Sequence, residues 1–197
     1  MNSGYTTPVH LSGDHVTLEP LSLNHADGLA EAVRDGELYS LWYTSIPRPE
    51  EMQREIRTRL QKQEDGLIAA YTVLTVSTAT PIGMTTFLNP DTANQHIEIG
   101  STWISAAAQG TKVNKEMKFL MLRHAFETLQ CERVELRTHH MNRKSRAAIE
   151  SLGAHLDGIL RRHRLLDNGT WRDTCVYSIL RHEWPTVKAG LAATLAQ

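Results

Sequence analysis

The sequence predicts an α+β fold with three layers, in which helices flank a mixed, twisted sheet of about seven strands. Short segments with alternating apolar residues and longer segments with a helical period follow one another in the order β-α-α-β-β-β-α-β-α-β-β. A doubly wound nucleotide-binding fold would alternate strand and helix throughout, so this order excludes it. The chain has 197 residues, which is enough for one domain with a sizeable core and too few for two.

The elements are predicted from periodicity and from the residues that end them. Val16 and Leu18 alternate with polar neighbours in a first strand that Pro20 ends, and Ser22 or Asn24 can cap a helix that runs to about residue 33. The remaining elements are predicted at these residues: a helix at 50–64, strands at 67–76, 81–88 and 96–104, a helix from about 112, a strand at 133–138, a helix at 142–152, a hairpin of strands at 155–166 and 170–180, and an Ala-rich helix from 184. We therefore expect a polar arm at residues 1–14, a single domain at 15–184 and a C-terminal helix at 185–197 that packs on the domain or extends from it.

The composition limits the classes of partner. Lys and Arg number 21 and Asp and Glu 22, a net charge of −1 that implies neither a nucleic-acid nor a membrane partner. Cys131 and Cys175 have no metal-ligand spacing and no disulfide framework, and no apolar run is long enough to span a bilayer. The histidines form no His-x-x-x-His or His-Glu-x-x-His pair, so we expect no metal. We expect a soluble, cytoplasmic protein that is monomeric or homodimeric.

One segment carries more information than the rest of the chain. Residues 103–115, with the sequence WISAAAQGTKVNK, predict a strand, a tight turn of small residues and a helix that begins near Lys112. The apolar residues of this helix repeat with a period near 3.6, at Val113, Met117, Leu120, Met121 and Leu129. Free backbone N–H groups and the positive dipole end at such a helix start bind phosphate. The strand that leads into it suggests a ligand with a diphosphate at one end and an extended arm at the other.

Five segments together resemble, in the same order, the GCN5-related N-acetyltransferases (GNAT), in the branch that acetylates ribosomal-protein N-termini. They are the first strand at 15–21, the strand motif at 98–100, the acetyl-CoA loop from Gln109 to Asn114, the helix at 142–154 with its Asn-x-x-Ser-Arg start, and the last hairpin at 168–178. The resemblance covers residues 9 to 184. It implies a pair of parallel central strands that splay apart, so that the pantetheine arm of acetyl-CoA pairs with the open edge of one of them.

The resemblance also implies the function and the residues that hold the cofactor. The activity is acetyl transfer from acetyl-CoA to a primary amine by direct attack in a ternary complex, and the acceptor is a protein N-terminus, an amino acid, a polyamine or an amine antibiotic. The alternative is a non-catalytic acyl-CoA-binding sensor or interaction module. The implied cofactor-binding residues are Thr102, Trp103, Ile104, Gln109, Gly110, Thr111, Lys112, Val113, Asn114, Lys115, Asn142, Ser145 and Arg146.

Lys112 departs from the family pattern, because this loop position is usually glycine. A glycine lets a ligand approach the backbone without a Cβ in the way. The lysine either directs its ammonium at the diphosphate or weakens cofactor binding, and a solvated side chain at a helix start is the third possibility.

Acetyl transfer to an amine needs a base, an acid and an oxyanion donor. Glu98 is the candidate base, and strand alternation puts it on the face opposite Ile97, Ile99 and Trp103. The alternatives to a catalytic role are a glutamate on a solvated strand face and one paired with Arg137 across the sheet. Ser145 is the candidate acid, and the backbone N–H of Trp103 or Ile104 the candidate oxyanion donor. The candidate substrate pocket comprises Tyr39, Trp42, Tyr43 and Glu98, although core packing explains the aromatic residues equally well.

Overall fold

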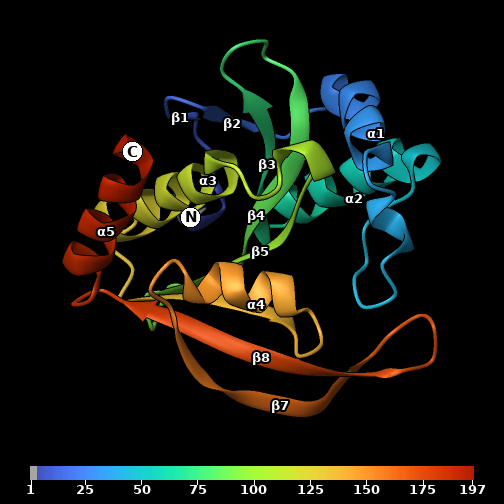
Figure 1. The fold of residues 1–197 in the computed structure, drawn as a ribbon. Helices are drawn as coiled ribbons and strands as arrows, with labels where there is room; N and C mark the ends of the chain where they lie inside the picture. Colours follow the sequence, from blue (N-terminus) through green and yellow to red (C-terminus); the bar gives the residue numbers. More distant parts are fainter. Residues whose placement is uncertain (1–3) are drawn as a thin grey trace.

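The computed structural model describes residues 4–197, which form an eight-stranded sheet with helices on both faces (Figure 1). The strands are β1 (Leu11–Ser12), β2 (Val16–Pro20), β3 (Ile68–Thr75), β4 (Pro81–Asp91), β5 (His96–Ile104), β6 (Arg133–His139), β7 (His155–Leu165) and β8 (Trp171–Leu180). The α-helices are α1 (Ala26–Arg34), α2 (Met52–Glu64), α3 (Lys112–Arg123), α4 (Arg143–Glu150) and α5 (Trp184–Ala196). The strand order is β1-β2-β3-β4-β5-β6-β8-β7, and only β5 and β6 pair in parallel among these strands.

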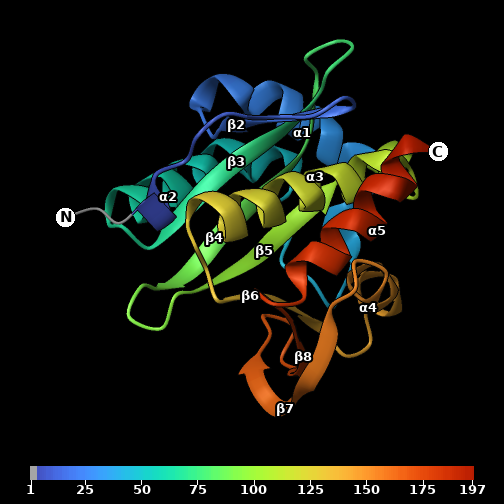
Figure 2. The ribbon, with the colours of Figure 1, turned by 90° about the vertical axis from the view of Figure 1, so that its left-hand side faces the viewer.

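Two apolar clusters hold the layers together, one on each face of the sheet. The larger cluster contains Met117 and Leu120 of α3, Ile149 of α4 and Leu191 of α5. The smaller cluster contains Leu29 of α1 with other buried residues of α1 and α2. Figures 1 and 2 accordingly show α3 and α5 side by side, with α1 and α2 on the opposite side of the sheet. Both faces of the central strands are therefore covered.

The parallel strands β5 and β6 separate soon after they begin. They pair only at His96–Arg133, Ile97–Val134 and Glu98–Glu135, although β5 continues to Ile104 and β6 to His139. Beyond Glu98, β5 stays paired with β4 on its other edge. The edge of β5 that faces β6 is consequently open over its second half, as an edge that receives an extended ligand must be.

A β-bulge interrupts β5 at the point where it leaves β6. Gly100 and Trp103 of β5 oppose Thr86 and Met84 of β4, so β5 has one residue more than β4 between these pairs, and Ser101 has a left-handed φ of 45°. The extra residue reverses the alternation of side chains beyond it. Trp103 therefore packs in the cluster on the α1 and α2 face, and the prediction that it shares a face with Ile97 and Ile99 is wrong.

The amino-terminal segment differs from the expected polar arm. Leu11 and Ser12 form β1, which pairs antiparallel with β2, while residues 1–3 lie outside the described part of the chain. Within residues 4–197, no helix combines the length and apolar character needed to cross a membrane.

Candidate active site

The loop before α3 exposes backbone N–H groups at the carboxyl end of β5. Thr111 is the N-cap of α3: its Oγ1 accepts from the Val113 N–H at 3.3 Å and donates to the Ala108 carbonyl at 2.7 Å. Gly110 has a φ of 74°, and nothing lies within 4 Å of the position where a Cβ would be. The first N–H groups of a helix have no intrahelical acceptor, so this open loop suits a diphosphate.

The remaining residues predicted for this loop lie on its two sides. Gln109 connects the loop to β5, because its Nε2 donates to the Ile104 carbonyl at 3.2 Å. Val113, Asn114 and Lys115 form the first turn of α3 and are half-buried. The loop is thus held in place from β5 while its backbone stays open.

Lys112 contacts the C-terminal helix. Its Nζ donates to the carbonyl of Leu195 at the end of α5, at 3.0 Å. An ammonium group suits the carbonyl end of a helix, where the dipole is negative. The lysine at this usual glycine position thereby joins the start of α3 to the end of α5.

The peptide bond between Trp103 and Ile104 presents a donor to the open edge of β5. A Cβ at Gly83 of β4 would lie 2.2 Å from the Trp103 carbonyl oxygen, so that carbonyl faces β4. The C=O and N–H of a trans peptide bond point in opposite directions, and the Ile104 N–H therefore points away from β4. Of the two donors predicted from the sequence, the geometry favours the N–H of Ile104.

The start of α4 brings three of the predicted residues together. Asn142 caps the helix, with its Oδ1 accepting from the Ser145 N–H at 3.1 Å. Ser145 is half-buried in the first turn of α4. Arg146 donates from Nε to the Tyr177 hydroxyl at 3.0 Å, and that hydroxyl donates to Glu150 at 2.7 Å. The Nδ2 of Asn142 is not used in capping and is free to contact a ligand amide.

Glu98 is a buried carboxylate on the face of the sheet that α1 and α2 cover. The residue is 7% exposed, its Oε2 accepts from Asn89 Nδ2 at 2.8 Å, and the Nε of Arg137 lies 3.4 Å away. Burial raises the pKa of Glu98 above its ordinary value, which the hydrogen bond from Asn89 and the charge of Arg137 partly offset. The pair with Arg137, which was the alternative to a base, is thus present in the structure.

Two of the three candidate aromatic residues gather at the end of β6. The ring of Trp42 lies 5.3 Å from that of His139, and the ring of Tyr43 lies 6.2 Å from it. The Trp42 carbonyl also accepts from Asn168 Nδ2, at the tip of the β7–β8 hairpin, at 3.0 Å. Tyr39 lies elsewhere: it packs against the smaller apolar cluster, with the Arg48 guanidinium 5.4 Å from its ring.

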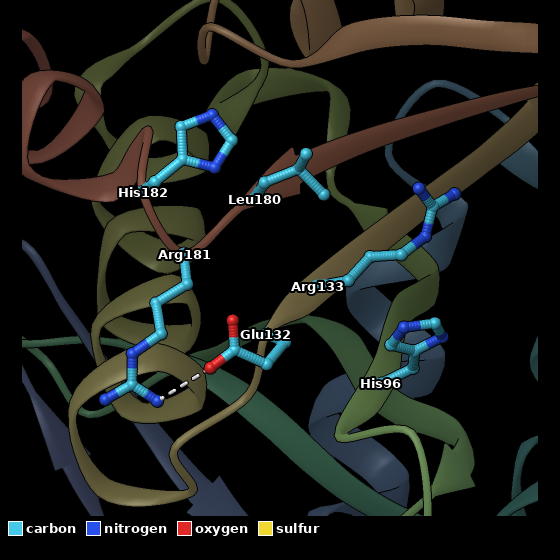
Figure 3. A pocket seen from close by; sticks show the side chains of 6 residues that line it. All are labelled: His96, Glu132, Arg133, Leu180, Arg181 and His182. Atoms are coloured by element: carbon cyan, nitrogen blue, oxygen red, sulfur yellow. Dashed lines mark hydrogen bonds and ion pairs between the residues drawn. The ribbon is translucent and has the colours of Figure 1, made fainter.

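Two cavities lie away from these residues. One, of about 530 Å³, is at the start of β5 and β6 beside the end of β8, where Figure 3 shows Glu132 turned toward Arg181. Another, of about 680 Å³, lies between the end of α4 and α5. Neither includes a residue predicted to bind acetyl-CoA or the acceptor.

Three residues near this region were not predicted as candidates. His139, the last residue of β6, and Arg172, near the start of β8, lie on the same face of the sheet as Glu98. Lys118 of α3 is buried, and its Nζ donates to Thr102 Oγ1 at 2.9 Å. Alternation along β6 and β8 could have placed the first two on this face, because Leu136 and Tyr177 mark the core side of these strands.

A parallel strand pair that separates near a bulge, with an open helix start at one end and a buried carboxylate beside it, agrees with the acyltransferase that the sequence predicts. Residues 15–155 match the model of the acetyltransferase (GNAT) domain family. The chain belongs to this family, is an N-acetyltransferase and uses acetyl-CoA.

Known proteins resemble the chain over nearly its full length. YdaF of Bacillus subtilis, provisionally named a ribosomal N-acetyltransferase, is 26% identical over 174 residues, which are 87% of this chain and 94% of YdaF. A solved structure from T. thermophilus, provisionally described as an acetyltransferase, is 34% identical with a TM-score of 0.83, covering 95% of this chain and 97% of that one. Mycobacterium smegmatis RimJ, solved with CoA-disulfide, shares the fold at 19% identity with a TM-score of 0.81 and 96% coverage of both chains.

The residues present fit the cofactor that the family requires. The N–H groups at Gly110 and along the first turn of α3 can receive the diphosphate, and the open edge of β5 can pair with an extended amide chain. Asn142 and Ser145 lie at the start of α4, with unused side-chain groups. These assignments of individual residues remain predictions.

Proposed function

We propose that the chain acetylates a primary amine by direct attack within a complex of enzyme, acetyl-CoA and amine, with Glu98 as the base. The observation that carries this proposal is the position of Glu98. It is the last residue of β5 that pairs with β6, and its side chain points to the face opposite α3. An amine that approaches from that face meets a carboxylate immediately before the open edge of β5.

The side chains around Glu98 suit proton transfer. Its raised pKa makes the carboxylate a better proton acceptor than an exposed glutamate. The hydrogen bond from Asn89 fixes the orientation of one carboxylate oxygen. When bound, acetyl-CoA would supply the acetyl group as a thioester. The Ile104 N–H would then donate to the thioester carbonyl oxygen, Glu98 would take the proton of the amine, and Ser145 would give a proton to the departing thiolate.

The names of the relatives point to one class of acceptor. YdaF and a structure from Vibrio fischeri carry names that refer to ribosomal proteins. A protein N-terminus is therefore a candidate acceptor, together with amino acids, polyamines and amine antibiotics. The acceptor can be identified by offering the enzyme amines from all four classes and measuring the CoA thiol released with each.

The Glu98→Gln variant tests the catalytic role. The amide cannot accept the amine proton, so we expect kcat to fall by about a hundredfold or more while calorimetry shows unchanged CoA affinity. In the unmodified enzyme, activity should fall as the pH drops through the raised pKa of Glu98, because the protonated carboxyl is no longer a base.

Glu135→Gln is the matched control. Glu135 pairs with Glu98 in the sheet register and contacts the same arginine, with its Oε2 2.7 Å from Arg137. If Glu98 only positions Arg137, both variants should slow turnover alike, and that result would contradict a role as base. CoA binding without thiol release from any amine would instead support a non-catalytic acyl-CoA sensor.

A further inference from the structure

The face of the sheet that carries Glu98 also carries a guanidinium group that forms no direct ion pair among the described residues. Arg172, near the start of β8, is half-buried, and its Nε donates to Thr174 Oγ1 at 2.9 Å. Within residues 4–197, no carboxylate lies within 4 Å of this guanidinium, and its two terminal nitrogens have no hydrogen-bond partner. Burial and the nearby charge of Arg164 lower the pKa of Arg172, and the charge of Glu98 partly offsets this effect.

The two arginines of β6 on this face, Arg133 and Arg137, both form ion pairs with carboxylates. Arg133 lies 2.8 Å from Asp157 and 3.0 Å from Glu135, and Arg137 lies 2.7 Å from Glu135 and 3.4 Å from Glu98. A buried charge without a partner is costly, whereas the same charge in a well-formed pair is tolerated. Arg172 therefore differs from Arg133 and Arg137 in having no carboxylate in direct contact.

A second unpartnered donor lies beside Arg172. His139 is 3% exposed, and its Nδ1 accepts from the Met141 N–H at 3.1 Å, so the neutral ring carries its proton on Nε2. That Nε2 is buried and has no partner among the described residues. His139 pairs across the sheet with Thr174, the residue whose hydroxyl accepts the hydrogen bond from Arg172. The pKa of His139 is lowered mainly by burial, then by the charge of His140 and then by that of Arg172.

We propose that Arg172 and His139 bind the carboxylate of a small amine acceptor of the amino-acid class, with its amino group toward Glu98. The inference rests on the proposed function and narrows its acceptor. The planar fork of a guanidinium matches the two oxygens of a carboxylate, and a neutral imidazole N–H adds a third donor. The rings of Trp42 and Tyr43, which pack against His139, border this site.

The same geometry disfavours two other acceptor classes. In a peptide N-terminus the carbonyl next to the amine belongs to a neutral amide, which leaves the guanidinium charge uncompensated. A polyamine would place a second cation near Arg172, and like charges repel. An amine that carries its own carboxylate supplies both the anion for Arg172 and the proton donor for Glu98.

Matched sets of amines test the inference. Each set contains an amino acid, its carboxamide and its decarboxylated amine, and peptides with N-terminal serine or alanine are added. We expect KM, from thiol release, to be at least about tenfold lower for the acid than for its amide. Arg172→Met should raise KM for the acid about thirtyfold and leave that for the amide unchanged, because truncating one partner of a desolvated charge pair removes a few kcal/mol.

Two further variants and one binding measurement keep the outcome clear. Arg57→Met removes an exposed guanidinium of α2, which forms no part of this site, and should leave the acid-to-amide ratio unchanged. Arg172→Lys, which keeps the charge without the fork, should restore part of the preference. Calorimetric binding of CoA to each variant reports an intact fold.

Equal KM values for acids and amides, or a preference for peptides that Arg172→Met does not change, would overturn the inference while leaving N-acetyl transfer in place. Absence of thiol release with every amine would instead overturn the proposed function, and this inference with it.

Discussion

At the scale of single residues, Lys118 of α3 is a buried amine that has no carboxylate partner within residues 4–197. It is 6% exposed, and Thr102 Oγ1 accepts its hydrogen bond beyond the point where β5 leaves β6. Burial lowers its pKa from 10.5 to about 7. A group this deep in the protein costs stability whenever it is charged.

The pH dependence of stability should report this lysine. Between about pH 7 and 10.5 the unfolded chain binds the proton that the folded protein has lost, so the free energy of unfolding rises with pH across this window. Lys118→Met removes the dependence and should raise the free energy of unfolding at pH 7 by about 1–3 kcal/mol.

Urea unfolding from pH 7 to pH 10 measures the effect of Lys118→Met. Lys62→Met, at an exposed position of α2, is the control and should leave the slope of stability against pH as it is in the unmodified protein. A Lys118→Met variant with the same slope as the unmodified protein would show that the ammonium reaches water in solution.

At the scale of elements, a single carboxylate joins α3 to the turn before β2. Glu116 of α3 accepts three backbone N–H groups, from Asp14 at 2.8 Å, His15 at 2.7 Å and Val16 at 2.8 Å. It also requires glycine at position 13, where a Cβ would lie 2.5 Å from the carboxylate carbon. The position of α3, and hence of the loop at its start that we predict to bind the diphosphate, depends on this contact.

Replacing Glu116 should therefore affect both folding and cofactor binding. Glu116→Ala leaves three N–H groups without acceptors, and we expect the free energy of unfolding to fall by about 3 kcal/mol or more. CoA affinity should fall as well, because α3 loses its connection to β2. Denaturant unfolding and calorimetry measure the two effects, with Glu64→Ala at an exposed position of α2 as the control. A loss below about 1 kcal/mol would mean that water replaces the carboxylate.

How far the sequence predicts the elements depends on the range of the interactions that form them. Residues 96–104 and the helix start at Lys112 agree with the structure because local periodicity and turn residues determine them. The two-residue strand β1 has no period to detect. The prediction of the face on which Trp103 lies was wrong, because the bulge at Ser101 cannot be seen in the alternation of polar and apolar residues.

The candidate site is less predictable than the elements, for the same reason. The cap of α4 at Asn142 and the start of α3 near Lys112 depend on local contacts, and the sequence predicts both. The unpaired state of Arg172 and the packing of Trp42 on His139 involve residues far apart in the chain, so no short motif reports them.

At the scale of the whole molecule, the loop after α1 and the β7–β8 hairpin meet on the face of the sheet that carries Glu98. Figure 1 shows the two segments converging beside the ends of β7 and β8. Asn168 joins them, because its Nδ2 donates to the Trp42 carbonyl at 3.0 Å while its Oδ1 accepts from Thr170 N–H and Oγ1 within the hairpin turn. One side chain thus connects segments that are 126 residues apart.

Asn168→Asp separates these two functions of the side chain. The carboxylate keeps the acceptor for Thr170 and so preserves the turn, but it cannot donate to Trp42 and repels the carbonyl. We expect faster backbone hydrogen exchange in residues 41–44 and a higher KM for the acceptor, with CoA affinity unchanged, because Trp42 loses its anchor beside His139. Asp167→Asn changes the charge of the same turn without touching this contact and should alter neither quantity. Unchanged exchange at residues 41–44 in Asn168→Asp would mean that the rings of Trp42, Tyr43 and His139 hold the loop without help from the hairpin.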